Sequence, residues 1–138
     1  MKELYCITCP TGCQLRVDGG GSDITVEGNG CKRGVDFAVM ETTNPTRSLT
    51  TTVRTTFPDT PVLPVRTDGE IPKGEIMEAM ETLGRVVVSS VLNCGDTVIE
   101  NLLGTGVRVI ATSDVLARGD QHYKPKGMQA GRISSEYN

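Results

Sequence analysis

The chain has 138 residues, of which 37% are hydrophobic and 4% aromatic, with no tryptophan. This length predicts one domain or two small ones, and the net charge of -3 argues against nucleic-acid binding, which needs a concentrated basic face. No apolar run approaches the roughly 20 residues of a membrane-spanning helix, and the first residues lack the apolar core of a signal peptide. We therefore expect a cytoplasmic protein that does not insert into membranes.

Four of the five cysteines occupy the first 31 residues with the spacing C-x2-C-x3-C-x17-C: Cys6, Cys9, Cys13 and Cys31. Where thiols stay reduced, cysteines spaced this closely are more often metal ligands than disulfide partners. Turns at residues 7–8 and 10–12 would let three sulfurs converge, with backbone N–H groups directed at them. An expected hairpin of strands 14–17 and 24–26 would bring Cys31 back to the first three cysteines.

Three states of these cysteines fit the pattern. A [4Fe-4S] cluster bound by all four thiolates is favoured, because the x2 and x3 spacings resemble those of iron–sulfur proteins. A structural Zn²⁺ ion is the alternative, although zinc ribbons repeat C-x2-C in both halves and the second half offers one cysteine here. Reduced structural thiols or a disulfide framework is the third. A metal centre would stabilise an N-terminal third that has few large apolar residues.

The cysteine segment and the adjoining Lys32-Arg33-Gly34 resemble the N-terminal iron–sulfur segment of molybdopterin oxidoreductases such as formate dehydrogenase. Residues 45–54, with their pattern of proline, arginine, leucine and a further arginine, are similar to the next stretch of those enzymes. The gap between the third and fourth cysteines is shorter here, and the resemblance covers only residues 4–54 and no pterin-binding domain, so no molybdenum cofactor is implied. In those enzymes the equivalent lysine lies between cluster and redox partner. The resemblance thus implies a tuning or relay role for Lys32, with Arg33 the weaker candidate; the alternative is two solvated side chains at a helix start.

Over its whole length the chain more closely resembles a small bacterial "CxxC motif-containing" family of unassigned function, DUF1667. The stretches that match are the four cysteines, Asn44-Pro45-Thr46-Arg47, Pro64-Val65-Arg66-Thr67 and Ile71-Pro72-Lys73. Members of that family tend to be encoded beside flavoprotein dehydrogenases of the glycerol-3-phosphate dehydrogenase type. The resemblance implies a small electron-transfer or accessory subunit that forms a hetero-oligomer with such a flavoprotein.

The remaining patterns predict an α+β fold in three parts. Residues 1–67 would form the four-cysteine domain, with a helix at 32–43 ended by Asn44-Pro45 and two strands rich in threonine and valine. Arg47, Arg54 and Arg66 make those strands locally basic, either to steer an acidic partner and support the cluster or simply as a solvated face. Residues 68–118 would form a small αβ domain, and the polar tail 119–138, with the lone histidine, would order only along a partner.

The expected αβ domain holds one helix whose apolar stripe includes Ile71, Ala79, Met80 and Leu83. Cys94 is interpreted as a buried thiol. Residues 104–106 lack the third glycine and the subsequent helix of a phosphate loop, so they are interpreted as a turn.

No catalytic constellation is present in the sequence. Four thiolate ligands would leave no open metal position, which favours electron transfer over catalysis by this chain alone. The competing hypotheses are a zinc-stabilised interaction subunit without a redox role and, third, a factor that delivers metal or clusters.

Overall fold

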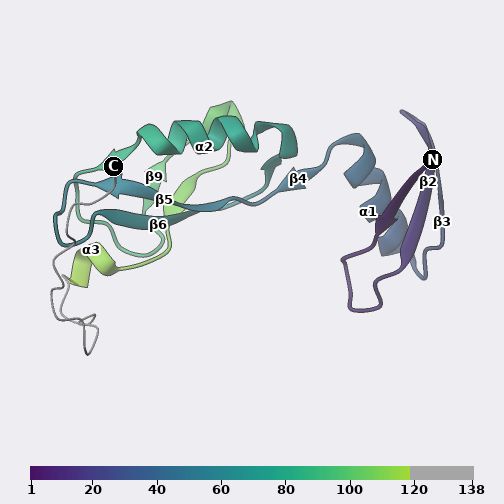
Figure 1. Ribbon diagram of the computed structural model, residues 1–138, viewed down its shortest axis with the longest axis horizontal. Coiled ribbons are helices and arrows are strands. Elements are labelled where there is room, and N and C mark those ends of the chain that lie inside the picture. Colours follow the sequence, from purple (N-terminus) through teal and green to yellow (C-terminus); the bar gives the residue numbers. More distant parts are fainter. Residues whose placement is uncertain (119–138) are drawn as a thin grey trace, which may run out of the picture.

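The computed structural model describes residues 1–118. This part of the chain combines a three-stranded, a five-stranded and a two-stranded sheet with short helices, which confirms the expected α+β class. Figure 1 shows two units joined by a narrow connection that comes after helix α1 (Lys32–Thr43). Within the described residues, no helix combines the length and the apolar character that crossing a membrane requires.

The N-terminal unit is an antiparallel sheet of strands β1 (Lys2–Tyr5), β2 (Gln14–Gly20) and β3 (Asp23–Glu27), with α1 packed against it. Alternation along β2 puts Leu15 and Val17 inside and the residues between them outside, as a half-buried strand requires. The buried core is small: Cys6, Leu15, Val17 and Ala38.

Two glycines make the returns of this sheet possible. Gly19 has φ +92°, and a Cβ there would lie 1.9 Å from the carbonyl oxygen of Asp23. Gly28, with φ +83°, leads from β3 toward Cys31, and a Cβ there would lie 2.2 Å from the carbonyl oxygen of Gln14. Both positions combine left-handed backbone with a close approach that only glycine permits.

The C-terminal unit is built on a five-stranded sheet in the order β8-β5-β6-β10-β9. The strands are β5 (Thr50–Thr55), β6 (Val62–Thr67), β8 (Val87–Val88), β9 (Thr97–Ile99) and β10 (Val109–Ala111). Helix α2 (Ile76–Arg85) lies along one side, and the 3-10 turn η2 (Leu102–Gly104) and the short α3 (Val115–Arg118) complete the unit. Its core contains twelve buried residues, among them Val53, Leu63, Val65, Ala79 and Leu83.

One buried hydroxyl fixes the entry to this sheet. Thr67 is the buried polar residue of the described chain, and its Oγ1 accepts a hydrogen bond from the Leu49 N–H at 2.9 Å. The Thr67 N–H in turn donates to the Leu49 carbonyl oxygen at 2.9 Å. This exchange satisfies backbone groups where the chain enters β5.

The connection between the units is a two-stranded pairing of β4 (Thr46–Arg47) with β7 (Ile71–Pro72). It joins two of the stretches on which the family resemblance depends, although they are more than twenty residues apart. The backbone N–H of Lys73, the first residue of the 3-10 turn η1 (Lys73–Glu75), donates to the Pro45 carbonyl oxygen at 2.8 Å and extends the pairing.

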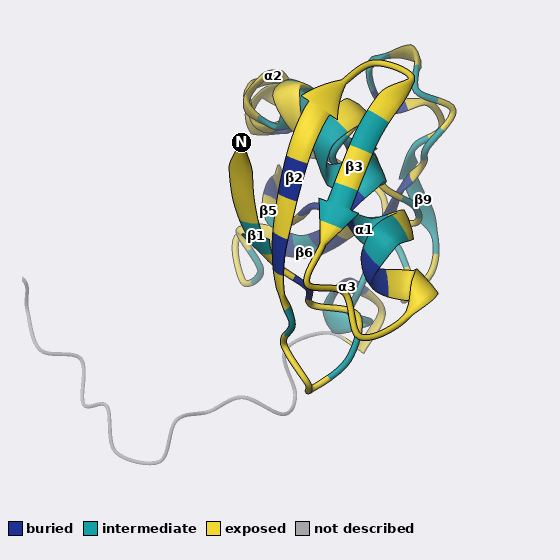
Figure 2. Cartoon of the chain, turned by 90° about the vertical axis from the view of Figure 1, so that its right-hand side faces the viewer, coloured by how far each residue is buried: buried dark blue, intermediate teal, exposed yellow. Residues whose placement is uncertain are grey.

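The structure corrects three expectations. The two cores separate near the β4–β7 connection and not after Thr67, because β6 pairs with β10 and both contribute to one core. Met80 is exposed, since α2 buries Ala79 and Leu83 and turns the neighbouring position outward. Ile71 precedes the helix, in β7. The burial pattern of both units is visible in Figure 2. The expectations for residues 119–138 lie outside the described residues.

Candidate metal centre

Three of the four predicted ligands lie in one loop between β1 and β2. The loop is closed at its base, because the Cys6 N–H donates to the Cys13 carbonyl oxygen at 2.8 Å. Within the loop, the Gly12 N–H donates to the Cys9 carbonyl oxygen at 3.4 Å, and Gly12 has φ +60°. The second bond is the turn expected at residues 10–12, whereas residues 7–8 form no hydrogen-bonded turn. The closed loop confines three thiols to one end of the N-terminal unit.

The fourth cysteine is presented by the start of a helix. Cys31 is the N-cap residue of α1, with extended backbone and an exposed side chain. The neighbouring Gly30 lies against the first loop, since a Cβ built there would lie 3.3 Å from the Cys13 sulfur. The β2–β3 hairpin therefore returns the chain to the cysteine loop, as the sequence predicted.

Hydrogen bonds favour the thiolate form at two of these sulfurs. The Thr11 hydroxyl and backbone N–H, together with the Gly12 N–H, lower the pKa of Cys9. The Gly34 N–H and the side chain and N–H of Arg33 lower the pKa of Cys31. A thiolate is the form that binds a metal, and N–H groups directed at sulfur also stabilise a negatively charged cluster.

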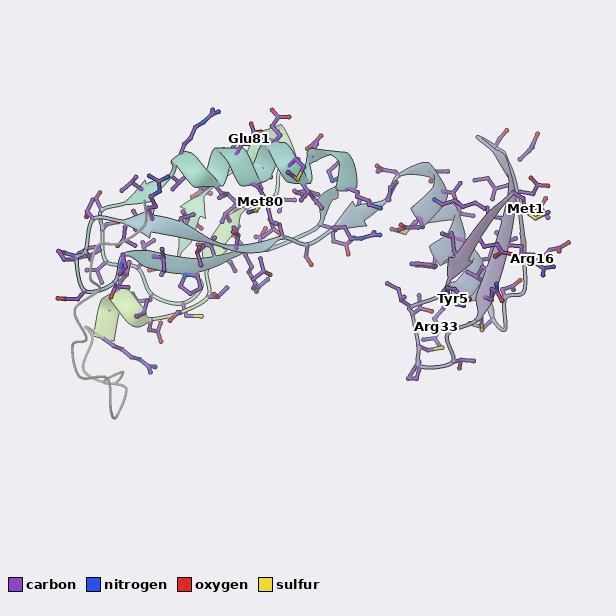
Figure 3. All side chains as sticks on the ribbon, viewed as in Figure 1. Met1, Tyr5, Arg16, Arg33, Met80 and Glu81 are labelled. Atoms are coloured by element: carbon purple, nitrogen blue, oxygen red, sulfur yellow. The ribbon has the colours of Figure 1, made fainter. Side chains whose placement is uncertain are left out.

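Arg33 is the cation that serves both cysteine segments. Its side chain lowers the pKa of Cys31 through hydrogen bonding and the pKa of Cys9 through its charge, and Figure 3 shows it at the same end of the unit as Tyr5, which directly precedes Cys6. Neither Lys32 nor Arg33 forms an ion pair with a carboxylate of residues 1–118. The pKa shifts of Cys9 and Cys31 favour Arg33, and the roles of both residues stay predictions.

The residues present fit a metal centre in type and placement but not as a closed ligand shell. All five cysteines are free thiols, and four of them come from two adjacent loops. Within residues 1–118, however, no three or more histidine, cysteine or acidic side chains are grouped so that they could hold one metal ion. Cys6, which is buried, is bonded instead to the Thr8 hydroxyl at 3.0 Å.

Cys94 stands apart from this group. It is exposed and not buried as expected, in a loop whose N–H groups are held by carboxylates: the Cys94 N–H donates to Asp114 at 2.6 Å and the Asn93 N–H to Asp96 at 2.7 Å. Because the loop is fixed through its backbone, the thiol itself needs no place in the core.

A cleft of about 460 Å³ opens beside the cysteine loop, between the two units. Its size lies within the range of small-molecule and side-chain binding pockets. Apolar and charged residues of both units line it, including Ile7, Phe37, Met40, Arg33, Arg47 and Glu70. Ile7, between Cys6 and Cys9, is 77% exposed and Met40 is 54% exposed. Sequence patterns did not indicate this cleft, because its walls come together only through the β4–β7 pairing.

An ion pair holds the end of α1 against that connection. Both terminal nitrogens of Arg47 donate to the Glu41 carboxylate, at 2.7 and 2.9 Å, and the Glu41 side chain is only 13% exposed. These hydrogen bonds lower the pKa of Glu41. The Thr46 hydroxyl donates to the carboxylate of Glu70, which directly precedes β7. The helix that presents Cys31 and Arg33 is thus fixed at its other end to the C-terminal unit.

Comparisons with known proteins match part of the chain. No curated protein has a sequence that matches the chain. The NMR structure of Clostridium perfringens protein CPE0013 is similar over 49% of this chain and 81% of that one, with 25% identity and a TM-score of 0.46. The family DUF1667, described as "Protein of unknown function", matches residues 32–113. That match begins directly after Cys31, so it includes Arg33 and none of the four clustered cysteines. Because it spans more than half of the chain, the protein belongs to the DUF1667 family.

Proposed function

We propose that the chain is a small iron–sulfur electron-transfer or accessory subunit of a flavin-dependent dehydrogenase, with Cys6, Cys9, Cys13 and Cys31 as ligands of a [4Fe-4S] cluster. The observation that carries the proposal is the meeting of a three-cysteine loop with a helix N-cap cysteine, where N–H groups and Arg33 favour thiolates. When bound, such a cluster would supply one-electron transfer. The loops would have to close around it.

The chain's own residues would set the properties of that centre. The positive charge of Arg33 beside two ligands favours the reduced, more negative cluster and so raises its reduction potential. The exposed residues 10–12 of the cysteine loop leave the centre close to the surface, where electrons can pass to a partner. The apolar side chains of Ile7 and Met40 at the neighbouring cleft offer contact area for that partner.

The proposed partner is a flavoprotein of the glycerol-3-phosphate dehydrogenase type, in a hetero-oligomer. Support for it comes from the family resemblance alone, through the genes that neighbour its members. In this complex the flavoprotein would oxidise the substrate, and the small subunit would carry electrons without catalysis of its own.

A zinc-stabilised interaction subunit is the second candidate, and one observation favours it. The N-terminal unit has four buried core residues against twelve in the C-terminal unit. So small a core needs a further source of stability, which a structural Zn²⁺ ion on the same thiolates would provide without redox chemistry.

Anaerobic purification followed by iron, zinc and sulfide analysis separates the two. About four irons and four sulfides per chain, with an electron paramagnetic resonance signal after dithionite reduction, would support the cluster; one zinc and no sulfide would refute it. Cys31→Ser should remove the signal and stop electron flow from the flavoprotein, which would keep its activity with artificial acceptors. Cys94→Ser, outside the site, is the matched control and should change neither. Normal electron flow in Cys31→Ser would contradict the proposal.

A further inference from the structure

The five-stranded sheet packs one face into the core and leaves most of β5 and β6 exposed on the other, where Ile110 of β10 is buried. Val53, Leu63 and Val65 share a core with Ala79 and Leu83 of α2. Because successive side chains of a strand alternate, their neighbours belong to the opposite face. Figure 1 shows α2 along one side of this sheet and only the short α3 near the other.

This second face has a defined pattern of cationic and aliphatic residues across four strands. Strand pairing places Arg54 between Val62 and Val87 in one row, and Arg66 between Thr50 and Ile110 in another. Thr52 and Pro64 form the row between these two. None of these eight positions is an acidic residue. We call this surface the Arg54–Arg66 face.

Arg54 and Arg66 have no carboxylate partner, unlike four other arginines of the described chain. Arg16, Arg47, Arg108 and Arg118 each form an ion pair with a carboxylate. Arg54 and Arg66 are exposed, and neither forms an ion pair with a carboxylate of residues 1–118. In a chain of net charge -3, this face therefore concentrates unneutralised positive charge.

The two valines that flank Arg54 are also exposed. Val62 is 47% exposed and Val87 is 53% exposed, although valine in a sheet is normally buried on at least one side by a neighbouring element. Arginine binds carboxylates bidentately through a planar fork, and it is enriched where interfaces form. Complementarity of charge then selects the partner that binds.

We propose that the Arg54–Arg66 face docks an acidic protein surface that presents carboxylates beside aliphatic side chains. Residues 119–138 of the chain are a poorer complement, since they contain two acidic and three basic side chains. A nucleic acid is disfavoured as well, because the face has two cations and no aromatic residue on which a base could stack. The inference does not depend on the cysteine site or on the function proposed for it.

Site-specific photo-crosslinking in cells that naturally make the protein tests this. Benzoylphenylalanine replaces Thr52, at the centre of the face, or Met77, 72% exposed on α2, as the control position. The expected product at Thr52 is a protein whose cross-linked peptide carries aspartate or glutamate next to aliphatic residues. Its yield should fall at least tenfold in R54E/R66E and at high salt, which screens exposed charges, and should be unchanged in the matched charge reversal R85E.

Each other outcome overturns the proposal. The first is an equal yield in R54E/R66E, and the second is a product that also forms from the Met77 position. The third is a product with nucleic acid, with residues 119–138 or with a second copy of the chain. The last is the absence of any product. Because the reversal adds two glutamates to a sheet, R54Q/R66Q is measured beside it. Both variants must keep the thermal unfolding midpoint of the parent, as expected for exposed positions, so a loss of yield reports on the face.

Discussion

Truncation of Leu15 tests whether the N-terminal unit depends on a metal. Leu15 is fully buried in a core of four residues. It packs against α1 at Gly34, where an added Cβ would lie 3.7 Å from the Leu15 Cδ2. Leu15→Ala should destabilise the metal-free unit by about 3 kcal/mol, within the usual cost of removing a buried leucine. That energy corresponds to about a hundredfold rise in the opening equilibrium.

Native-state hydrogen exchange measures this separately for each unit. In the metal-free chain, amides of β2 in Leu15→Ala should lose about a hundredfold of protection, while amides of β6 should be unchanged, because the two cores share no buried residue. Loading the variant anaerobically with iron and sulfide, or with zinc, should restore protection in β2. Thiolate binding of structural zinc is worth about 10 kcal/mol or more near pH 7, which exceeds the loss.

Leu63→Ala is the control, since Leu63 is fully buried in the core of the other unit. It should lower protection in β6 with little change in β2. Equal loss of protection in both strands for either variant would refute the separation of the two cores. Unchanged protection of β2 on metal loading would refute the metal as its source of stability.

Three further predictions concern the scaffold. Thr67→Val should lower the free energy of unfolding in urea by about 1–3 kcal/mol, because it leaves the buried N–H of Leu49 without its acceptor, and Thr67→Ser should cost less. Gly28→Ala should lower the iron or zinc content, since its Cβ would meet backbone at 2.2 Å, whereas Gly20→Ala, with open space around it and no left-handed backbone, should not. Arg47 lowers the pKa of the Glu41 carboxyl. The pair therefore stabilises the folded protein fully above the ordinary carboxyl pKa of about 4.3, and this stabilisation is lost as the pH falls through the lowered pKa. Urea unfolding from pH 7 to pH 3 should therefore show a smaller acid loss in Glu41→Gln than in the parent.

Local patterns in the sequence were sufficient for the local structure. The glycine-rich turn predicted the β2–β3 hairpin, and Asn44-Pro45 predicted the end of α1, because proline disfavours helix in the residue before it. Threonine and valine runs on either side of a proline-containing turn predicted β5 and β6. These signals act over a few residues, so they carry no information about distant partners.

The features that could not be predicted depend on long-range contacts or on direction around a helix. The β4–β7 pairing joins residues more than twenty apart, and it moves the separation of the two cores away from Thr67. Lys32 and Arg33 are consecutive in α1, about 100° apart around its axis, and periodicity does not say which of them faces the cysteine loop. For the same reason the apolar stripe was predicted to include both Ala79 and Met80, of which only Ala79 is buried.

Helix α1 is the element that the cysteine site and the family share. The DUF1667 match begins at its first residue, its N-cap is Cys31, and its last turn is fixed to β4 through Glu41 and Arg47. A partner seated in the neighbouring cleft would contact both units, so the distance for electron transfer would be set by this helix and its ion pair. Loss of the pair in Glu41→Gln should then slow electron transfer from the flavoprotein at unchanged iron content. A purely structural zinc site would show no change of rate at unchanged metal content, because it transfers no electrons.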